Sequence, residues 1–480
     1  MSRIPNPSSR MPNNEASMPL TLEPVLAQDT IQEIHEQSLD LLERVGINYK
    51  TPRALHVLEE AGCPVNYDRS WASLPRDLVA WALEQAPRLV RLCARDPSRD
   101  VVLDGSRAHH TCDSQGTEAI DLESGERRIS TAGDLRRGLL FADALDQIEI
   151  VNVMVAATDV PAHVRTIRHF ALAFSQTGKH VRTGVLHAGE VPFLVEMVKA
   201  ATGADEFRPI FSVVDCTISP LMHDGQMTEA CIELARLGVP IMVYPMPLAG
   251  GTSPVTLAGT MLLHNVEFLS GLVLYQVVNP GTPILYGTGA SQLNMQTGNF
   301  GGGADGHGMR LALCDLARTY NLPFNLWGLS TRSESLDALY GYEATAQCLL
   351  ARLAGADEIY SMGLLGSAQI LSLDKMVLDN HLARQIDIMV RPIPVDGEYL
   401  QADLIGGVGI GGHYLGQRET RAFTRREYVP VWPEAGAGLD QAVHAEALDI
   451  LHNHRPPALP AGAEDKIASI LAEADQALGG

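Results

Sequence analysis

Apolar residues follow two alternating patterns through the middle of the chain, and together they predict a parallel α/β barrel. Short apolar runs rich in β-branched residues predict buried strands, and each is followed by a loop and an amphipathic helical stretch. This alternation is typical of parallel βα units. Seven or eight units across about 250 residues fit a (β/α)8 TIM-type barrel better than an open sheet. The runs stand at 148–155, 180–186, 209–215, 240–246, 283–287, 323–327 and 358–363, with a weaker eighth at 387–393.

The two ends of the chain follow other patterns, which divide it into four regions. Residues 1–24 are polar and rich in Pro and Asn, which predicts a disordered arm. Residues 25–146 hold three helical stretches followed by β-rich runs, and we expect an N-terminal helical and β cap region there. The barrel is expected to occupy 147–400. Residues 401–480 are expected to form a C-terminal extension that wraps the barrel and includes helices.

Composition and charge limit the classes of partner. The chain has 480 residues, of which 46% are hydrophobic and 19% charged, so it has ample material for a buried core. A formal charge of −21 argues against nucleic acid and anionic membranes as partners. Seven cysteines without a CxxC pair, and no signal peptide, indicate a reducing cytoplasm. No apolar run approaches the ~20 residues needed to cross a bilayer.

The carboxyl ends of barrel strands carry the working residues of such folds, and here those ends are aromatic. Aromatic residues make up only 5% of the chain, yet four strand ends carry Tyr or Trp. An aromatic wall suits a cationic ammonium through cation–π attraction, although some of these rings could simply pack over the barrel. The candidate substrate-binding residues from this pattern are Asp215, His223, Tyr244, Tyr286, Phe300, His307, Trp327 and Tyr360.

Glycine-rich stretches offer loops that can approach a ligand closely. The stretch 298–308 follows the run 283–287 and is either an open connection or part of a site. Neither this stretch nor 409–413 has a nearby lysine, which weakens any case for phosphate binding. No His, Cys, Asp or Glu spacing predicts a metal site. Lys375 is expected on a solvated helix face rather than as a Schiff-base lysine.

Four long motifs resemble the trimethylamine methyltransferase superfamily across about residues 25–435. They are HEQSLDLLERVGI at 35–47, MPLAGGTSPVTLAGT at 246–260, GADEIYSMGLLGSAQILSLDKMVLDN at 355–380 and GVGIGGHYL at 407–415. The resemblance implies a (β/α)8 barrel with an N-terminal extension, an oligomer, and transfer of a methyl group from an amine to a separate corrinoid protein. With a corrinoid (cobalamin) as acceptor, the candidate cofactor-binding residues are Gly250, Gly251, Gly301, Gly302, Gly366 and His413.

One departure from that family narrows the substrate. Members that act on trimethylamine carry pyrrolysine in a barrel loop, whereas 331–343 holds standard residues only, and the matching position falls near Leu339 or Tyr340. Members without pyrrolysine resemble glycine betaine methyltransferase. A quaternary ammonium departs as a neutral amine, so its attack by Co(I) needs alignment and electrostatics rather than a general acid. Tyr340 is therefore a further candidate, and a substrate carboxylate would need a donor from His223, His307 or Arg332.

The sequence thus predicts a cytoplasmic homo-oligomer that moves a methyl group from a glycine betaine-like quaternary amine to Co(I) of a small corrinoid protein. No tightly bound cofactor of its own is expected. The alternatives are a trimethylamine-type methyltransferase, a barrel lyase or hydrolase using Asp215 and a histidine such as His223, and a non-catalytic betaine-binding protein. The segment His109–Thr117 is either a lid over the mouth or a plain hairpin.

Overall fold

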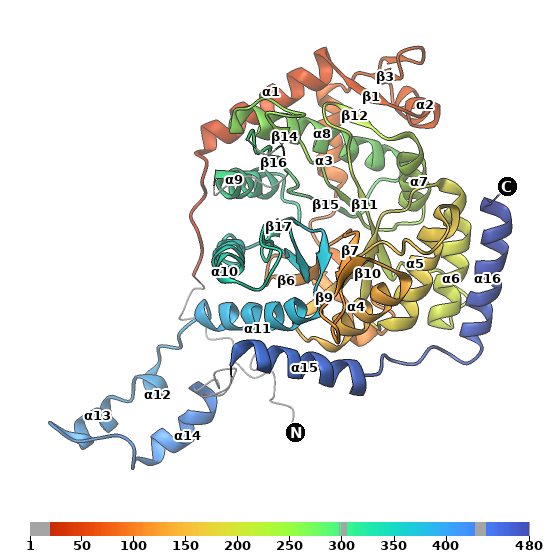
Figure 1. Ribbon diagram of the computed structural model, residues 1–480. Helices are drawn as coiled ribbons and strands as arrows, with labels where there is room; N and C mark the ends of the chain where they lie inside the picture. Colours follow the sequence, from red (N-terminus) through yellow and green to blue (C-terminus); the bar gives the residue numbers. More distant parts are fainter. Residues whose placement is uncertain (1–19, 297, 299–304, 428–437, 480) are drawn as a thin grey trace.

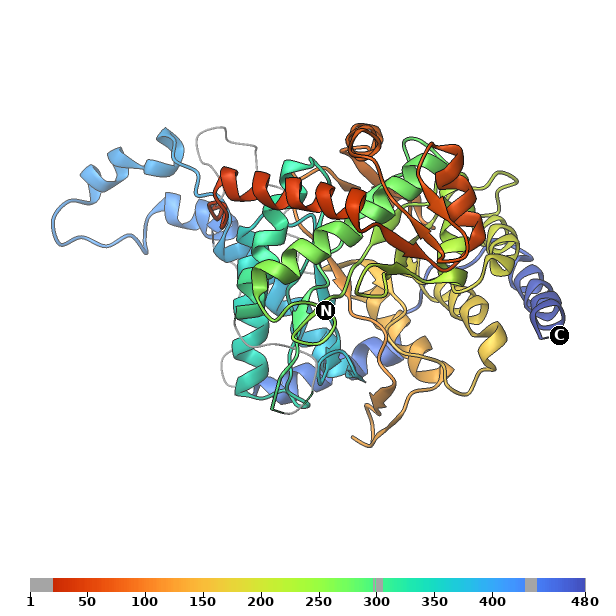
Figure 2. The ribbon, with the colours of Figure 1, turned by 90° about the horizontal axis from the view of Figure 1, so that it is seen from above.

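Eight parallel strands form a barrel in the computed structural model, which describes residues 20–296, 298, 305–427 and 438–479 (Figures 1 and 2). A backbone bridge between Tyr286 and Phe324 joins the two strands at the ends of the sheet order. The predicted TIM-type barrel is confirmed. In sheet order the strands are β15 (Ile284–Tyr286), β13 (Ile241–Val243), β11 (Phe211–Asp215), β10 (His180–Thr183), β9 (Ile148–Asn152), β6 (His109–Cys112), β18 (Glu358–Met362) and β17 (Asn325–Trp327).

One barrel strand differs from the prediction. Strand β6 pairs with β9 on one side and with β18 on the other, so the sheet begins ahead of residue 147. The predicted strand at 387–393 is wrong, because its first residues end helix α11 (Leu373–Met389). The polar sequence HHTC hid β6: all four residues are buried, whereas a buried strand is expected to be apolar. The segment from His109 is therefore neither a lid nor a plain hairpin at its start.

The amino ends of the barrel strands are closed by a hairpin of β4 (Val90–Leu92) and β5 (Val101–Leu103). Its apolar side chains pack against residues inside the barrel, among them Ile150 and Leu285. Next to this plug, Arg182 and Glu358 form two hydrogen bonds of 2.5 and 2.7 Å inside the barrel, and both side chains are fully buried. The hairpin and this ion pair therefore fill the interior of the barrel near its amino end.

Helix α8 (Leu257–Val278) lies between the barrel and the N-terminal helices. Among the described residues it is the one helix long and apolar enough to cross a membrane, a feature the sequence pattern did not reveal. Helices α1 (Gln28–Arg44), α2 (Pro52–Glu60) and α3 (Arg76–Gln85) pack against it, and 72% of its apolar stretch is buried inside the protein. A helix enclosed on all sides is apolar all round. Its composition is that of a core helix.

The remaining elements form the outer helices of the barrel and three small sheets. Helix α4 begins with a capping box, in which Thr131 is the N-cap residue and Asp134 is the third residue of the helix. The helices are α4 (Ala132–Ala144), α5 (Ala162–Gln176), α6 (Val191–Thr202), α7 (Gly225–Arg236), α9 (Asp305–Thr319) and α10 (Ala338–Leu353), with short turns η2 (Pro97–Arg99) and η3 (Ala188–Glu190). The small sheets contain β1 (Ile47–Tyr49), β2 (Val65–Asn66), β3 (Trp71–Ala72) and β12 (Met222–His223); β7 (Glu118–Ile120), β8 (Arg127–Ile129), β19 (Leu364–Leu365) and β20 (Ile370–Leu371); and β14 (Leu248–Ala249) with β16 (Ser291–Gln292).

The C-terminal part both wraps the barrel and projects from it. Helix α15 (Leu439–Asn453) packs on α11 and α4, and α16 (Ala463–Leu478) packs on α5 and α6. These two helices confirm the predicted wrapping extension. Between them and α11, an arm extends away from the barrel, at the lower left of Figure 1. The arm contains α12 (Gly397–Leu400), α13 (Ala402–Val408) and α14 (Arg418–Glu427).

Candidate functional site

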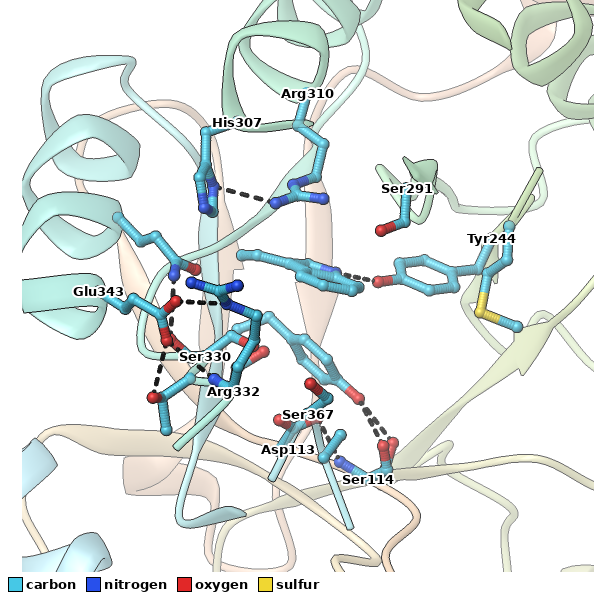
Figure 3. Close-up of a pocket in the computed structure, with 17 residues that line it drawn as sticks. Asp113, Ser114, Tyr244, Ser291, His307, Arg310, Ser330, Arg332, Glu343 and Ser367 are labelled. Atoms are coloured by element: carbon cyan, nitrogen blue, oxygen red, sulfur yellow. Dashed lines mark hydrogen bonds and ion pairs between the residues drawn. The ribbon is translucent and has the colours of Figure 1, made fainter. Parts of the chain in front are cut away.

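A cavity of about 140 Å³ lies at the carboxyl ends of the barrel strands (Figure 3). Strands β6, β13, β17 and β18 and helices α9 and α10 supply most of its wall. Five of the predicted substrate-binding residues line this cavity, and together they span more than 100 residues of the chain. These are Tyr244, His307, Trp327, Arg332 and Tyr360.

The aromatic wall of the cavity consists of Tyr244, Trp327 and Tyr360. The Trp327 indole N–H donates a hydrogen bond to the Tyr244 hydroxyl, and the rings of Tyr244 and Tyr360 lie 6.4 Å apart between centres. Both tyrosines are buried, and burial raises the pKa of each hydroxyl. The two hydroxyls therefore stay neutral, and the wall presents electron-rich ring faces without a negative charge of its own.

Arg310 supplies a buried positive charge at one end of the cavity. It lies in the first half of α9, and its Cζ stands 4.4 Å from the centre of the Trp327 ring. Its Nη2 donates to His307 Nδ1 at 2.9 Å and its Nη1 donates to the Ala290 carbonyl at 3.1 Å. Burial lowers the pKa of Arg310 to about 10, so the guanidinium keeps its charge at neutral pH. Burial, with Arg310 beside it, lowers the pKa of His307 to about 4, so this imidazole is neutral.

Asp113 supplies a buried negative charge at the other end (Figure 3). It follows β6, and its Oδ1 accepts a hydrogen bond of 2.9 Å from the Ser114 backbone N–H. The Tyr360 and Ser114 hydroxyls lie 2.7 Å apart beside it. Burial raises the pKa of Asp113 to about 6. This carboxylate is therefore mostly ionised at neutral pH, and it becomes protonated when the pH falls below about 6.

Arg332 and Glu343 also line the cavity, and these two charges neutralise each other. Arg332 Nε donates to Glu343 Oε1 at 2.7 Å, and its backbone N–H donates to Oε2 at 2.8 Å. The Thr331 hydroxyl donates to the same oxygen at 2.9 Å. The pair belongs to the segment 331–343, which also contains Leu339 and Tyr340. Because Arg332 is bound to Glu343, it is a poorer carboxylate donor than predicted.

Two predicted residues at strand ends, Asp215 and Tyr286, lie outside the cavity. Asp215 is fully buried and accepts a hydrogen bond of 2.7 Å from the Tyr275 hydroxyl on α8. The Tyr286 ring packs 4.1 Å from the Phe268 ring, also on α8. Alternate residues of a strand point to opposite faces, and these two point outward into the helix layer. His223 follows Asp215 into that layer, where it stacks on Tyr49 at 4.9 Å. The structure thus does not place a lyase-type Asp215 and His223 pair in the cavity.

Tyr340 also lies outside the cavity, in a buried cluster with Lys375 and Asp379. The Tyr340 hydroxyl donates to Asp379 at 2.8 Å, and Lys375 Nζ donates to Asp379 at 2.6 Å and to the Leu329 carbonyl at 2.9 Å. Lys375 is completely buried. The prediction that it lies on a solvated helix face is wrong, because its charge is neutralised inside the protein by a carboxylate four residues along the same helix.

The predicted cofactor-binding residues fall in three places. Gly250 and Gly251 form a turn after β14, and Gly366 forms the turn between β19 and β20, beside the cavity residue Ser367. Gly250 and Gly366 have φ of +84° and +61°, in the left-handed region that favours glycine. His413 lies on the projecting arm, away from the cavity. Phe300, Gly301 and Gly302 fall outside the described residues.

Several cavity residues were not predicted from the sequence. Arg310 closes the glycine-rich stretch and begins an apolar helical pattern, so its sequence context is that of a helix. Asp113 follows the one barrel strand that the pattern missed, and recognition of that strand would have placed this carboxylate at a strand end. Glu343 and Gln347 stand on α10, where no strand-end rule applies. Ser291 belongs to β16, a two-residue strand.

The carboxyl end of this barrel holds a small cavity lined by aromatic rings and by buried charges of both signs, which is the position and the make-up of an active site in a barrel enzyme. The comparisons with known proteins agree with that class. The model of the trimethylamine methyltransferase (MTTB) family matches residues 5–479, and the chain belongs to this family of methyltransferases. The family predicted from the four motifs is thereby confirmed.

The relatives include enzymes for two kinds of amine. The chain is 32% identical over 467 residues to the trimethylamine methyltransferase MttB of Desulfitobacterium hafniense (strain DSM 10664 / DCB-2), covering 94% of both chains. It is 28% identical over 471 residues to a glycine betaine methyltransferase of D. hafniense (strain Y51), covering 95% of this chain and 98% of the relative. Among solved structures, the hydroxylamine complex of MtmB matches with a TM-score of 0.54 and 10% identity, over 95% of this chain and 88% of that one. That likeness supports the fold.

Proposed function

We propose that this protein transfers a methyl group from a quaternary ammonium compound of the glycine betaine type to the cobalt of a corrinoid carried by a separate small protein. The observation that carries the proposal is the placement of Tyr244, Trp327 and Tyr360 in one cavity with the carboxylate of Asp113. Ring faces and a carboxylate attract an ammonium that cannot donate an ordinary hydrogen bond. The likeness to a glycine betaine methyltransferase over nearly its full length supports the same substrate class.

The cavity residues would act by position and charge. The rings and Asp113 would hold the ammonium with one methyl group toward the mouth, and the enclosing wall would exclude water. The departing amine is neutral and takes up no proton, which agrees with a lining whose His307 is neutral and whose tyrosine hydroxyls have raised pKa values. The corrinoid would supply a Co(I) nucleophile for the methyl group. Alignment of two bound reactants can provide much of the rate enhancement of such a reaction.

The rim of the cavity is compatible with the approach of a large flat cofactor. Gly250, Gly251 and Gly366 carry no side chains, and a Cβ on Gly250 would stand only 3.2 Å from Met295 Sδ. Met246, which lines the cavity, is 41% exposed, and Met295, beside Gly250, is 72% exposed. These apolar side chains would cover a corrinoid ring on docking. We keep these glycines as proposed corrinoid contacts.

The assembly and location of the protein belong to the same proposal. The arm exposes large apolar side chains, with Ile410 fully exposed and Leu415 88% exposed. Exposed apolar groups of this kind are typical of interaction surfaces, which supports a homo-oligomer. All seven cysteines are free thiols, which agrees with a reducing cytoplasm.

The test combines the purified protein with reduced cobalamin and one methylated amine at a time. The panel is glycine betaine, choline, tetramethylammonium and trimethylamine, and absorbance follows loss of Co(I) while mass spectrometry identifies the demethylated amine. We expect dimethylglycine from glycine betaine, and a strong loss of rate in Trp327→Leu. A matched control is Trp81→Leu, which changes an indole in the N-terminal helices. Transfer from no quaternary amine, with either free cobalamin or a corrinoid protein, would refute the proposal.

A further inference from the structure

Two donors in the cavity have no partner among the described residues. They are Nε of Arg310 and Oγ of Ser291, and the two residues are only 3% and 1% exposed. An unsatisfied buried donor costs about 1–3 kcal/mol, and more where the group is charged. Such groups in a cavity wall point to an acceptor that arrives with a ligand.

The charged side chains of the cavity are of two kinds, those that pair with each other and those without a partner of opposite charge. Arg332 and Glu343 neutralise each other, whereas no described carboxylate lies within ion-pair distance of Arg310. Asp113 accepts hydrogen bonds, and no described Lys, Arg or His lies within ion-pair distance of it. Among the described residues, Arg310 and Asp113 are therefore the two uncompensated charges of the cavity. A ligand that satisfies both must carry a positive and a negative group at once.

The two charges lie at opposite ends of the cavity. Figure 3 places Arg310, His307 and Ser291 at one end, and Asp113, Ser114 and Ser367 at the other. A guanidinium fork matches the two oxygens of a carboxylate, and a serine hydroxyl can donate to the same group. His307 cannot add a charge, but it accepts from Nη2 and so holds the fork in place.

We infer that Arg310 and Ser291 form an anion subsite that binds the carboxylate of a zwitterionic quaternary amine. The ammonium then lies toward Asp113, and the two ends fix the direction in which the molecule binds. This inference rests on the proposed function and adds to it a basis for choice among amines. Trimethylamine in its protonated form and tetramethylammonium offer no acceptor to these donors, and choline offers one neutral hydroxyl in place of the two carboxylate oxygens. A site built to bond a group discriminates strongly against an analogue that lacks it.

The experiment measures binding and methyl transfer separately for glycine betaine and choline, which share the trimethylammonium group. The variant is Arg310→Gln, and the matched control is Arg318→Gln, on the same helix but bonded to Asp315 outside the cavity. We expect Arg310→Gln to weaken glycine betaine binding by about 10- to 100-fold in calorimetry, the range for loss of a charged hydrogen bond, and choline binding by less than about threefold. Ser291→Ala should weaken glycine betaine binding by about threefold to tenfold, and Arg318→Gln should leave both affinities unchanged.

The two proposals fail in different ways. Unchanged affinity for glycine betaine in Arg310→Gln, or equal losses for glycine betaine and choline, would overturn the anion subsite even if methyl transfer proceeds. Arg310-dependent binding of glycine betaine without any methyl transfer would support the subsite and refute the proposed function. If Arg310→Gln does not fold, as judged by circular dichroism, Ser291→Ala decides between the two ligands in the same assay.

Discussion

Two arginines are buried in the same barrel, and their surroundings differ completely. Arg182, near the amino end, donates from Nε to Ser212 and from both terminal nitrogens to Glu358. Arg310, at the carboxyl end, has an imidazole, a carbonyl and an aromatic face but no described carboxylate. A fully paired charge serves the fold, whereas an uncompensated one keeps its capacity for a ligand. The amino end of the barrel thus holds a charge that is paired within the fold, and the carboxyl end holds one that we propose to be available to a ligand.

The largest expected effect is a loss of stability when Arg182 loses its carboxylate partner. Glu358→Gln removes the negative partner and leaves a buried guanidinium without compensation, which is expected to lower the free energy of unfolding by about 3–5 kcal/mol. Urea denaturation followed by circular dichroism measures this change. The matched control is Glu36→Gln, whose partner Arg76 is bound at 2.7 Å on the surface and whose loss should cost less than about 1 kcal/mol.

Equal destabilisation by Glu358→Gln and Glu36→Gln would contradict the assignment of a structural role to the buried pair. A second variant sharpens the result. Arg182→Met combined with Glu358→Gln removes both charges, and it should recover part of the stability that Glu358→Gln loses, because the unpaired charge causes most of the cost.

The periodic pattern predicted seven of the eight barrel strands because these strands are continuously apolar and their helices amphipathic. It missed β6, where His109, His110 and Thr111 are buried in place of apolar residues. The pattern also identified residues at strand ends, but not whether each side chain points into the barrel or toward the surrounding helices. Tyr244 faces the cavity while Tyr286, at the end of the neighbouring strand, faces α8. A single residue of register decides between these outcomes, and the pattern fixes strand ends only to within a few residues.

The charged residues were harder to place than the aromatic ones. Lys375 has the sequence context of a surface helix, yet its ammonium group is buried. It donates hydrogen bonds to Asp379 and the Leu329 carbonyl, and it lies over the Tyr340 ring. Arg310 and Asp113 line opposite ends of one cavity, although about 200 residues separate them in the chain. Only the closed barrel brings such partners together, so their pairing, or its absence, is not visible in the sequence.

A smaller effect is expected from pH on the negative end of the cavity. The pKa of Asp113 is raised to about 6, chiefly by burial, with Ser114, Tyr360, Ser361 and Lys375 acting against the rise. The carboxylate is ionised above this pH and protonated below it. Choline, which does not titrate in this range, should therefore bind about tenfold more weakly at pH 5 than at pH 7. Calorimetry at several pH values measures the profile.

Asp113→Asn is the control for this profile, and it should bind choline weakly and without pH dependence. The folded protein holds the Asp113 proton more tightly than the unfolded chain does, so acidification favours the folded state through this residue. Protonation of Asp113 would therefore not unfold the protein, and it cannot lower the affinity at pH 5 in that way. An unchanged profile in Asp113→Asn would show that another group governs the ammonium end.

The smallest expected change in stability concerns the unpaired arginine. Arg310→Met replaces a buried, uncompensated guanidinium by an apolar side chain of similar length that can still cover the Trp327 ring. The cost of desolvating the charge disappears together with the two hydrogen bonds to His307 and Ala290. We therefore expect the free energy of unfolding to change by less than about 1 kcal/mol, in contrast to Glu358→Gln. A loss as large as that of Glu358→Gln would mean that Arg310 holds the fold rather than a ligand.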